Sequence, residues 1–244
     1  MSDLKIKYPL MWQKDDFFIK IFCSIPNIAT GILISAKDKY FIVDPGDGLL
    51  RDINKELKLE QILNISNIFI SHGHHDHIGG LWSLLTYFNV MKKKEDVNIF
   101  YPKGSREIES IYKAFAQVYK REISYKIQLN PIDKSEIIDI GIISVLPFKV
   151  NHMEHEKKAG KPVPVPSLGF KFIYSGKSIC YGGDTAYCET LVQNVVNSDL
   201  AIVEAGALDD ENCEMHMTIK QAQSIGKTAK EHFLVHIPER KLNS

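Results

Sequence analysis

The sequence predicts an α/β (α+β) protein in which two β-sheets pack together and helices cover their outer faces. Short apolar segments rich in β-branched and aromatic residues, bounded by Pro, Asn and Gly, recur in both halves of the chain, as strands do. Segments with apolar residues at helical spacing alternate with them. Runs of strands with interspersed helices, in two similar halves, are typical of two packed sheets.

The first half is expected to form mainly strands, with helices between the later ones. The predicted strands are Phe17–Ser24, Ala29–Ser35, Lys39–Asp44, Asn67–Ser71 and Val97–Tyr101. A sharp turn over Asp44–Gly48 separates the third strand from the first helix. The predicted helices are Leu49–Leu59, Asp76–Lys93 and Gly104–Glu122.

The second half repeats this pattern. The predicted strands are Ile123–Leu129, Ile142–His152, Leu168–Ser175, Lys177–Asp184, Asp199–Ala205 and His232–Ile237, and the predicted helices are Glu189–Val196 and Thr218–Glu231. Two segments, Glu154–Ser167 and Gly206–Met217, show no regular pattern, and long loops in compact proteins often carry function. Without a repeat or a linker-like stretch, residues 1–244 are expected to form a single domain.

Composition narrows the class of protein. Lys+Arg and Asp+Glu are 30 each, so no overall basic field calls for nucleic acid. No signal peptide is evident and no apolar run is long enough to span a bilayer, so we expect a cytoplasmic protein without membrane contact. The cysteines form no CxxC pair and are expected to be free thiols; they are Cys23, Cys180, Cys188 and Cys213.

The stretch "NIFISHGHHDHIGGLWSLL" contains the motif H-x-H-x-D-H, formed by His72, His74, Asp76 and His77. A buried strand leads into it, an apolar helix follows, and Gly73 allows a tight turn. The two clustered imidazoles can bind one metal ion, and Asp76 with His77 can bind a second. This ligand chemistry suits zinc, and also manganese or iron. The alternative, a solvated polar loop, would leave this spacing between two apolar segments unexplained.

Three further residues each end a predicted strand: His152, Asp184 and His236. Strand ends on one edge of a sandwich converge in space, and a metal site needs such convergence. Each residue alone would be read as an ordinary surface histidine or turn aspartate. In a chain that already contains H-x-H-x-D-H, the three are expected to complete a binuclear metal site.

From about Thr30 to Pro238 the chain resembles the metallo-β-lactamase fold superfamily, through H-x-H-x-D-H with "IGG", the later His152, "GGDT" and the final His236. This resemblance implies a four-layer αββα sandwich of two packed mixed sheets with outer helices. "VPSLGFKF", "VEAG" with Glu204 and "HMTIKQAQ" with His216 resemble the ribonuclease Z-like phosphodiesterase branch.

The resemblance to this branch implies a set of roles for the site residues. One metal ion would be held by His72, His74, His152 and Asp184, and the other by Asp76, His77, Asp184 and His236, with Asp184 bridging. Both ions would be divalent, zinc being expected and manganese possible in its place. Asp76 would orient or deprotonate the attacking water between the two ions. His216 would contact the phosphate or protonate the leaving oxygen, oriented by Glu204, for which a surface or capping acid is the alternative.

The long Gly/Pro-rich basic arm of tRNA-processing ribonuclease Z has no counterpart in this sequence. The chain therefore resembles more closely the compact phosphodiesterases that cleave cyclic nucleotides, such as anti-Pycsar enzymes. This predicts hydrolysis of a small phosphodiester, a 3′,5′-cyclic nucleotide, by a homodimer. Glu154–Ser167 and the aromatic helix Ile108–Tyr119 are candidates for a lid and an interface; a rigid loop and a core-facing helix are the alternatives.

Three other functions stay open at this point. A ribonuclease Z-type tRNA 3′-end endonuclease would bind nucleic acid. A thioester or lactone hydrolase of the glyoxalase II type would use the same metal site, although the Glu204 and His216 motifs argue against it. A metal-stabilised protein that only sequesters a nucleotide would not need so complete a set of ligands.

Overall fold

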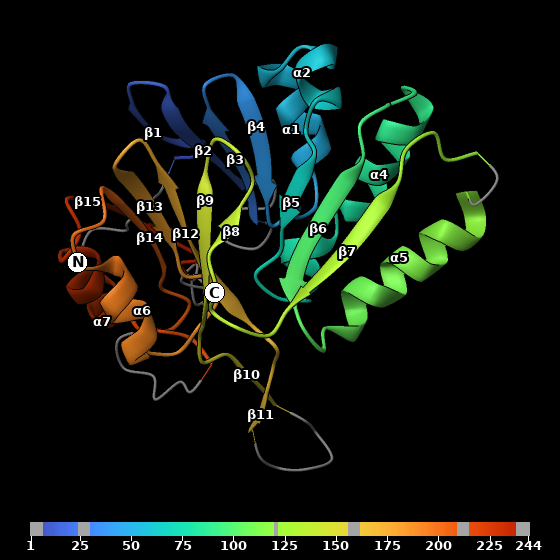
Figure 1. The fold of residues 1–244 in the computed structure, drawn as a ribbon. Helices are drawn as coiled ribbons and strands as arrows, with labels where there is room; N and C mark the ends of the chain where they lie inside the picture. Colours follow the sequence, from blue (N-terminus) through green and yellow to red (C-terminus); the bar gives the residue numbers. More distant parts are fainter. Residues whose placement is uncertain (1–6, 24–29, 120–121, 156–161, 209–214, 238–244) are drawn as a thin grey trace, which may run out of the picture.

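The computed structural model describes residues 7–23, 30–119, 122–155, 162–208 and 215–237. Its first sheet has seven strands in the spatial order of the sequence (Figure 1): β1 (Leu10–Lys14), β2 (Phe17–Cys23), β3 (Thr30–Ala36), β4 (Lys39–Val43), β5 (Asn67–Phe69), β6 (Val97–Pro102) and β7 (Ile127–Ile132). Strands β1 to β4 pair antiparallel, whereas β4 to β7 pair parallel. The sheet is therefore mixed.

The second sheet has six strands in the order β15-β14-β13-β12-β9-β8. Their bounds are β8 (Ile138–Asp139), β9 (Ser144–Lys149), β12 (Leu168–Tyr174), β13 (Lys177–Tyr181), β14 (Leu200–Glu204) and β15 (Glu231–Val235). β13, β14 and β15 pair parallel, and the other neighbours pair antiparallel. This sheet is mixed as well.

Helices cover the outer face of each sheet (Figure 1). Those on the first sheet are α1 (Leu49–Glu56), α2 (Leu59–Leu63), α4 (Leu81–Val90) and α5 (Arg106–Tyr119), with the one-turn α3 (His75–Ile78) at its end. Those on the second sheet are α6 (Glu189–Val195) and α7 (Ile219–Gly226). The four-layer αββα sandwich of two mixed sheets expected from the sequence is confirmed.

Alternation along the strands builds this layering, because successive side chains of a strand point to opposite faces. Ile32 and Ile34 of β3 lie in the core between the sheets, and Leu33 packs against the helices outside. In β14, Ile202 faces the first sheet while Val203 packs under α6 and α7. Strands buried on both faces read as continuous apolar runs, as these do.

The structure corrects several expected boundaries. β1 was not predicted, because only Trp12 of its five residues is buried and the alternation is short. The predicted helix Leu49–Leu59 is two helices, since Leu57 takes an extended conformation that ends α1.

The aromatic helix is α5, and its Ile108 and Phe115 are buried against the first sheet, in keeping with a core-facing helix.

The segment Glu154–Ser167, expected to be irregular, contains part of a small antiparallel hairpin. Its strands are β10 (Met153–His155) and β11 (Pro162–Pro164), and Figure 1 shows the hairpin projecting from the body of the protein. The Val165 N–H donates to the His152 carbonyl at 3.0 Å, which fixes the base of the hairpin. Residues 156–161 and 209–214, including the predicted free thiol Cys213, lie outside the described residues.

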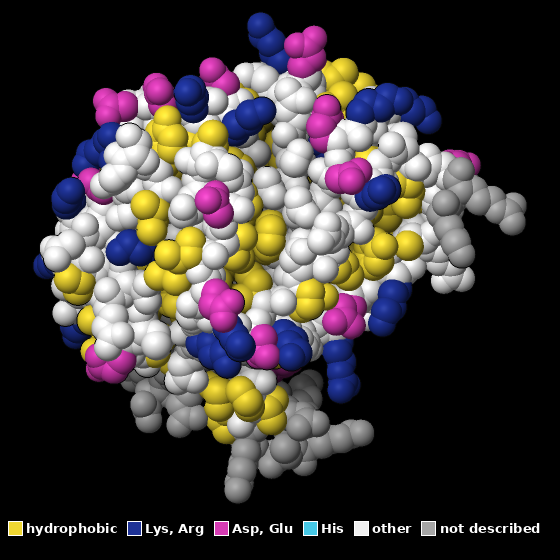
Figure 2. All heavy atoms as spheres, viewed as in Figure 1, with side chains coloured by type: hydrophobic (Ala, Val, Ile, Leu, Met, Phe, Trp, Pro, Cys, Tyr) yellow, Lys and Arg dark blue, Asp and Glu magenta, His cyan; other side chains and the backbone are white. Residues whose placement is uncertain are grey.

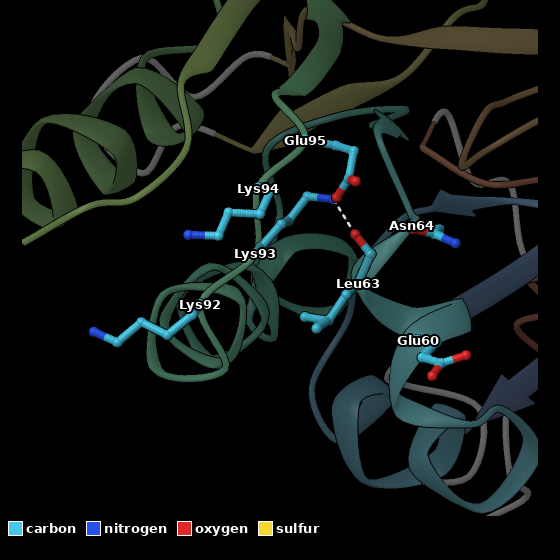
Figure 3. A pocket seen from close by; sticks show the side chains of 7 residues that line it. All are labelled: Glu60, Leu63, Asn64, Lys92, Lys93, Lys94 and Glu95. Carbon is cyan, nitrogen blue, oxygen red and sulfur yellow. Dashed lines mark hydrogen bonds and ion pairs between the residues drawn. The ribbon is translucent and has the colours of Figure 1, made fainter.

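The charge run Lys92–Lys94 is not simply a solvated helix end, which is the default reading of such a run. Lys92 and Lys94 are exposed, but the Lys93 side chain is fully buried. Figure 3 shows Lys93 turned toward Leu63, whose carbonyl accepts its Nζ proton, and Glu95 lies 3.7 Å from the same Nζ. Burial lowers the pKa of Lys93 even though Glu95 opposes this effect.

We expect Lys93→Ala to lower the free energy of unfolding by about 2 kcal/mol, because the packed stem is lost and the Leu63 carbonyl loses its partner. Lys92→Ala and Lys94→Ala are matched controls on either side and should change it by less than about 0.5 kcal/mol. Urea denaturation of the three variants tests this. Equal effects for all three would mean that burial of Lys93 does not stabilise the fold.

No helix within the described residues is long and apolar enough to cross a membrane.

Candidate metal centre

The histidines and aspartates singled out in the sequence gather where strands of both sheets end. The chain leaves β5 into His72 and His74, and the short helix α3 carries Asp76 and His77. In the second sheet, the candidate residues follow three strands: His152 comes after β9, Asp184 after β13 and His236 after β15. The structure brings all seven into two adjoining groups.

The first donor group is His72, His74 and His152, which each offer a ring nitrogen, and these atoms lie within 4.8 Å of one another. His74 Nδ1 and His152 Nε2 are 3.2 Å apart. The His152 Nδ1 contacts the Met215 carbonyl at 3.2 Å, so this ring is held from the opposite side. Three imidazoles in one place form a suitable ligand set for a divalent cation.

The second donor group is Asp76, His77, Asp184 and His236. His77 Nε2 lies 3.3 Å from Asp76 Oδ2 and 3.4 Å from Asp184 Oδ1. His236 Nε2 lies 3.4 Å from Asp76 Oδ2 and 3.5 Å from Asp184 Oδ2. Asp184 is placed in this group and not in the first, so its bridging role stays a prediction.

Two buried nitrogen atoms test whether these residues fit a metal ion. His72 Nε2 and His77 Nε2 are buried and make no well-directed hydrogen bond in the described part of the chain, although Asp76 Oδ2 and Asp184 Oδ1 lie 3.3 and 3.4 Å from His77 Nε2. Buried polar atoms are nearly always paired, and an unpaired one needs an explanation. Each of these nitrogens belongs to a donor group whose other members are imidazoles or carboxylates. A divalent cation in each group would satisfy both nitrogens, so the residues fit the metal chemistry.

Three residues behind the donor groups were not identified as site residues from the sequence: Asp44, Ser71 and Tyr181. The buried Asp44 carboxylate accepts the Ser71 N–H and hydroxyl, each at 2.6 Å, and the Tyr181 hydroxyl at 2.7 Å. Asp44 Oδ2 also lies 2.8 Å from His77 Nδ1, and the Ser71 Oγ lies 3.0 Å from His72 Nδ1. Asp44 directly follows β4, just as the candidate ligands follow their strands. This signal was missed because Asp44 belongs to the sequence "DPGDG", which is typical of a turn.

Glu204 ends β14 and is 1% exposed, so it is not a surface or loop acid. Its Oε1 accepts the backbone N–H groups of Thr185 and Met217, at 3.1 and 3.2 Å, and its Oε2 accepts that of Gly206 at 2.6 Å. Its Oε1 is also 3.2 Å from His216 Nδ1. Glu204 thereby connects the loop that carries Asp184 with the segment that carries His216.

His216 lies beside both donor groups and belongs to neither of those found in the described residues. Its ring centroid is 5.6 Å from that of His152 and 5.2 Å from that of His236, on which it stacks. Thr218, two residues later, caps α7 by accepting the Gln221 N–H, which fixes where the His216 segment ends. Burial lowers the pKa of His216, but the hydrogen bond and charge of Glu204 outweigh it and raise the pKa above its ordinary value.

The loop before Asp184 depends on Gly183. This residue has a φ of +62°, and a Cβ built on it would lie 2.8 Å from the Ser71 Cβ. A side chain here would strain the backbone and push the Asp184 loop away from the strand end that carries His72. The glycine therefore lets the two sheets approach closely at the site.

Metal uptake at the second donor group should release protons. Burial lowers the pKa of His236, but the charge of Asp184 and the hydrogen bond with Asp76 raise it to about 9. At pH 7 this imidazole is therefore protonated in the metal-free chain, and a cation bound through its Nε2 must displace the proton. We expect about one proton released by His236 at pH 7, less at pH 9, and weaker zinc binding as the pH falls.

Zinc titration calorimetry in two buffers with different ionisation enthalpies measures this proton release. His236→Ala should release about one proton fewer than the unsubstituted chain at pH 7. Zinc binding without proton release at pH 7 would contradict the assignment of His236 to the metal centre.

Comparison with known proteins places this architecture in a family. Residues 39–237 match the family model described as beta-lactamase superfamily domain. Ribonuclease Z of Chlamydia abortus is 26% identical over 247 residues, which cover 83% of this chain and 78% of the relative.

Two solved structures are similar in fold. The metallo-beta-lactamase fold protein YhfI from Bacillus subtilis has a TM-score of 0.73 at 20% identity, with 94% of this chain and 89% of that one covered. The short form of human tRNase Z has a TM-score of 0.66 at 24% identity, with 87% and 86% covered. The resemblance inferred from the sequence is confirmed: the chain belongs to the beta-lactamase superfamily domain family and, within it, to the ribonuclease Z-like branch of metal-dependent hydrolases.

Proposed function

We propose that this protein is a dinuclear metal-dependent phosphodiesterase that hydrolyses a small phosphodiester, with a 3′,5′-cyclic nucleotide as the best candidate. The first and second donor groups would each hold one divalent ion, zinc or manganese. Two neighbouring ions, when bound, supply an activated water and neutralise the charge of the phosphodiester. The observation that carries the proposal is the position of His216. Its ring contacts the buried Glu204 and lies beside a histidine of each donor group.

The chain's own residues would then move two protons. Asp76 would accept a proton from the attacking water, since its Oδ2 faces the second donor group and its side chain is partly exposed. As the phosphorus–oxygen bond to the leaving group breaks, His216 would donate its proton to that oxygen. Glu204 raises the pKa of His216 and so favours the protonated imidazole that this role requires.

A substrate with a good leaving group tests the role of His216. General acid catalysis contributes about 10²–10⁴-fold when the leaving oxygen is strongly basic. His216→Ala should therefore slow the opening of a cyclic nucleotide by about that factor, and hydrolysis of bis(4-nitrophenyl) phosphate much less. Equal losses on both substrates would assign His216 to binding the phosphate and not to protonation.

Two features support a small substrate. Basic and acidic residues are equal in number, and Figure 2 shows them interspersed on the viewed face without a large positive patch. A protein that binds a long nucleic acid through its backbone needs several positive charges on one surface. The hairpin β10–β11, which adjoins His152, has only three residues in each strand.

A substrate panel tests the proposal. Turnover should be measured with zinc and with manganese against 3′,5′-cyclic nucleotides and a precursor tRNA, with Asp76→Ala as the control. We expect a cyclic nucleotide to be opened, with no turnover in the control. Cleavage of the tRNA at its 3′ trailer, without turnover of any cyclic nucleotide, would replace the proposal with the endonuclease function.

The second candidate is that tRNA 3′-end endonuclease, and one observation favours it: the curated relative compared above is a ribonuclease Z. A gel-shift experiment separates the two functions. Tight tRNA binding that weakens steeply with salt would favour the endonuclease, because each phosphate contact adds to the salt dependence.

Three further expectations accompany the proposal: residues 1–244 as one domain, a homodimer, and a cytoplasmic location. Light scattering coupled to size-exclusion chromatography tests the dimer, and an elution mass near 27.8 kDa would rule it out under those conditions.

A further inference from the structure

The contacts of Asp44 determine where protons sit on two histidines. An ionised carboxylate only accepts hydrogen bonds, so the Ser71 hydroxyl, 2.6 Å from Asp44 Oδ2, must donate its one proton to it. The same hydroxyl oxygen is 3.0 Å from His72 Nδ1 and has no second proton to give. His72 must therefore be the donor in that contact, with its proton on Nδ1.

The same reasoning applies to His77, whose Nδ1 lies 2.8 Å from Asp44 Oδ2. Facing a carboxylate, this nitrogen must carry a proton. With the proton on Nδ1, each neutral ring has its free electron pair on Nε2; for His77, any proton shared with the Asp76 and Asp184 oxygens 3.3 and 3.4 Å away must first be released. These two Nε2 atoms are the buried ring nitrogens that make no well-directed hydrogen bond among the described residues. In each ring, the hydrogen bond at Nδ1 therefore accounts for an Nε2 that is available to a metal ion.

Tyr181 adds a third donor from the other sheet. Its hydroxyl is 2.7 Å from Asp44 Oδ2, across 137 positions of sequence, and its side chain is 2% exposed. Tyr181 is the last residue of β13 and stands three positions before Asp184. Its hydrogen bond fixes the Asp44 carboxylate relative to the second sheet, where Asp184 is located.

We propose that Asp44, Ser71 and Tyr181 form one positioning network that sets the Nδ1-protonated form of both His72 and His77. Since His72 belongs to the first donor group and His77 to the second, one carboxylate prepares both groups for metal ions. Ser71 acts through His72, whereas Tyr181 acts by holding Asp44 against His77. Partners of this kind, behind metal ligands, change metal affinity by about 10–100-fold.

The inference rests on the metal-binding part of the proposed function and is independent of the substrate. It is tested with two variants of the full chain, Ser71→Ala and Tyr181→Phe. Zinc affinity is measured by competition with a chelating dye, and the imidazole N–H signals of the zinc-loaded protein are followed by nitrogen-edited NMR. Ser71→Ala should lower the affinity for one of the two zinc ions by about 10–100-fold and shift the Nδ1–H signal of His72. Tyr181→Phe should lower the zinc affinity by about 10-fold and shift the Nδ1–H signal of His77.

The chain provides a matched control for each variant. Ser105 has a buried hydroxyl without a partner among the described residues, and the buried Tyr125 hydroxyl donates to the Leu85 carbonyl at 2.8 Å. Neither belongs to the network, so Ser105→Ala and Tyr125→Phe should bind zinc as the unsubstituted chain does.

Two results would overturn the inference. One is a proton on Nε2 of zinc-loaded His72 or His77, and the other is zinc affinities of Ser71→Ala and Tyr181→Phe equal to those of the controls. If one variant does not fold, the other variant and the NMR spectrum of the unsubstituted chain still decide. No metal uptake by the unsubstituted chain would overturn the proposed function as well, and this result is distinct from the other two.

Discussion

Replacing Asp184 with alanine should lower phosphodiester turnover by more than about 100-fold, the upper range for a residue that only supports a metal ligand. Asp184 places one carboxylate oxygen 3.4 Å from His77 Nε2 and the other 3.5 Å from His236 Nε2. Its side chain is also buried. Without it, the second donor group keeps a single carboxylate, from Asp76, and binds a divalent cation less tightly.

Metal content and turnover should be measured together on this variant. Asp133→Ala is a suitable control, because that side chain is 58% exposed and pairs only with Lys103 among the interactions described for it. The control should keep full activity and metal content. An Asp184→Ala protein with normal metal content and more than half of the original turnover would exclude Asp184 from the centre.

Replacing Glu204 with alanine should have the largest effect on stability, lowering the free energy of unfolding by at least about 3 kcal/mol. Three backbone N–H groups, of Thr185, Gly206 and Met217, donate to this one carboxylate. Each buried donor left without an acceptor costs about 1–3 kcal/mol. His216 would also lose its partner, so activity should fall together with stability.

Denaturant unfolding of metal-free protein isolates the stability effect from metal binding. Glu204→Gln should have a smaller effect than alanine, because its amide oxygen can still accept one or two of the three N–H groups. Glu136→Ala, at a side chain that is 76% exposed, should change stability by less than about 0.5 kcal/mol. A loss below 1 kcal/mol in Glu204→Ala would mean that other acceptors take over the three N–H groups.

The layers of the fold were predictable because apolar strands such as Lys39–Val43 and Leu200–Glu204 are distinct in the sequence. The two-residue strand β8 and the Pro-containing strand β11 were not predictable, because both are too short to show an alternation of apolar and polar residues. Lys93 was missed because a run of lysines gives no sign that its middle member is buried. Long-range contacts decide each of these cases, and the local pattern does not contain them.

The candidate metal ligands stood out for a physical reason: each follows an apolar strand, and strand ends meet at one edge. Asp44 obeys the same rule but sits in a turn sequence, and turn aspartates are common. Ser71 and Tyr181 carry no such signal, because serine and tyrosine occur throughout proteins. The role proposed for them follows from their hydrogen bonds to Asp44, of which that of Tyr181 joins the two sheets.

The position of the donor groups at the junction of the two sheets has a consequence for how the molecule opens. His72 and His152, in the first group, come from different sheets, and so do His77 and Asp184 in the second. An ion bound in either group would therefore cross-link the two halves of the sandwich, and the halves could separate only after it left. The slow amide hydrogen exchange of the strands beside this junction should therefore occur at the rate of metal dissociation. A chelator should accelerate metal loss and this exchange together.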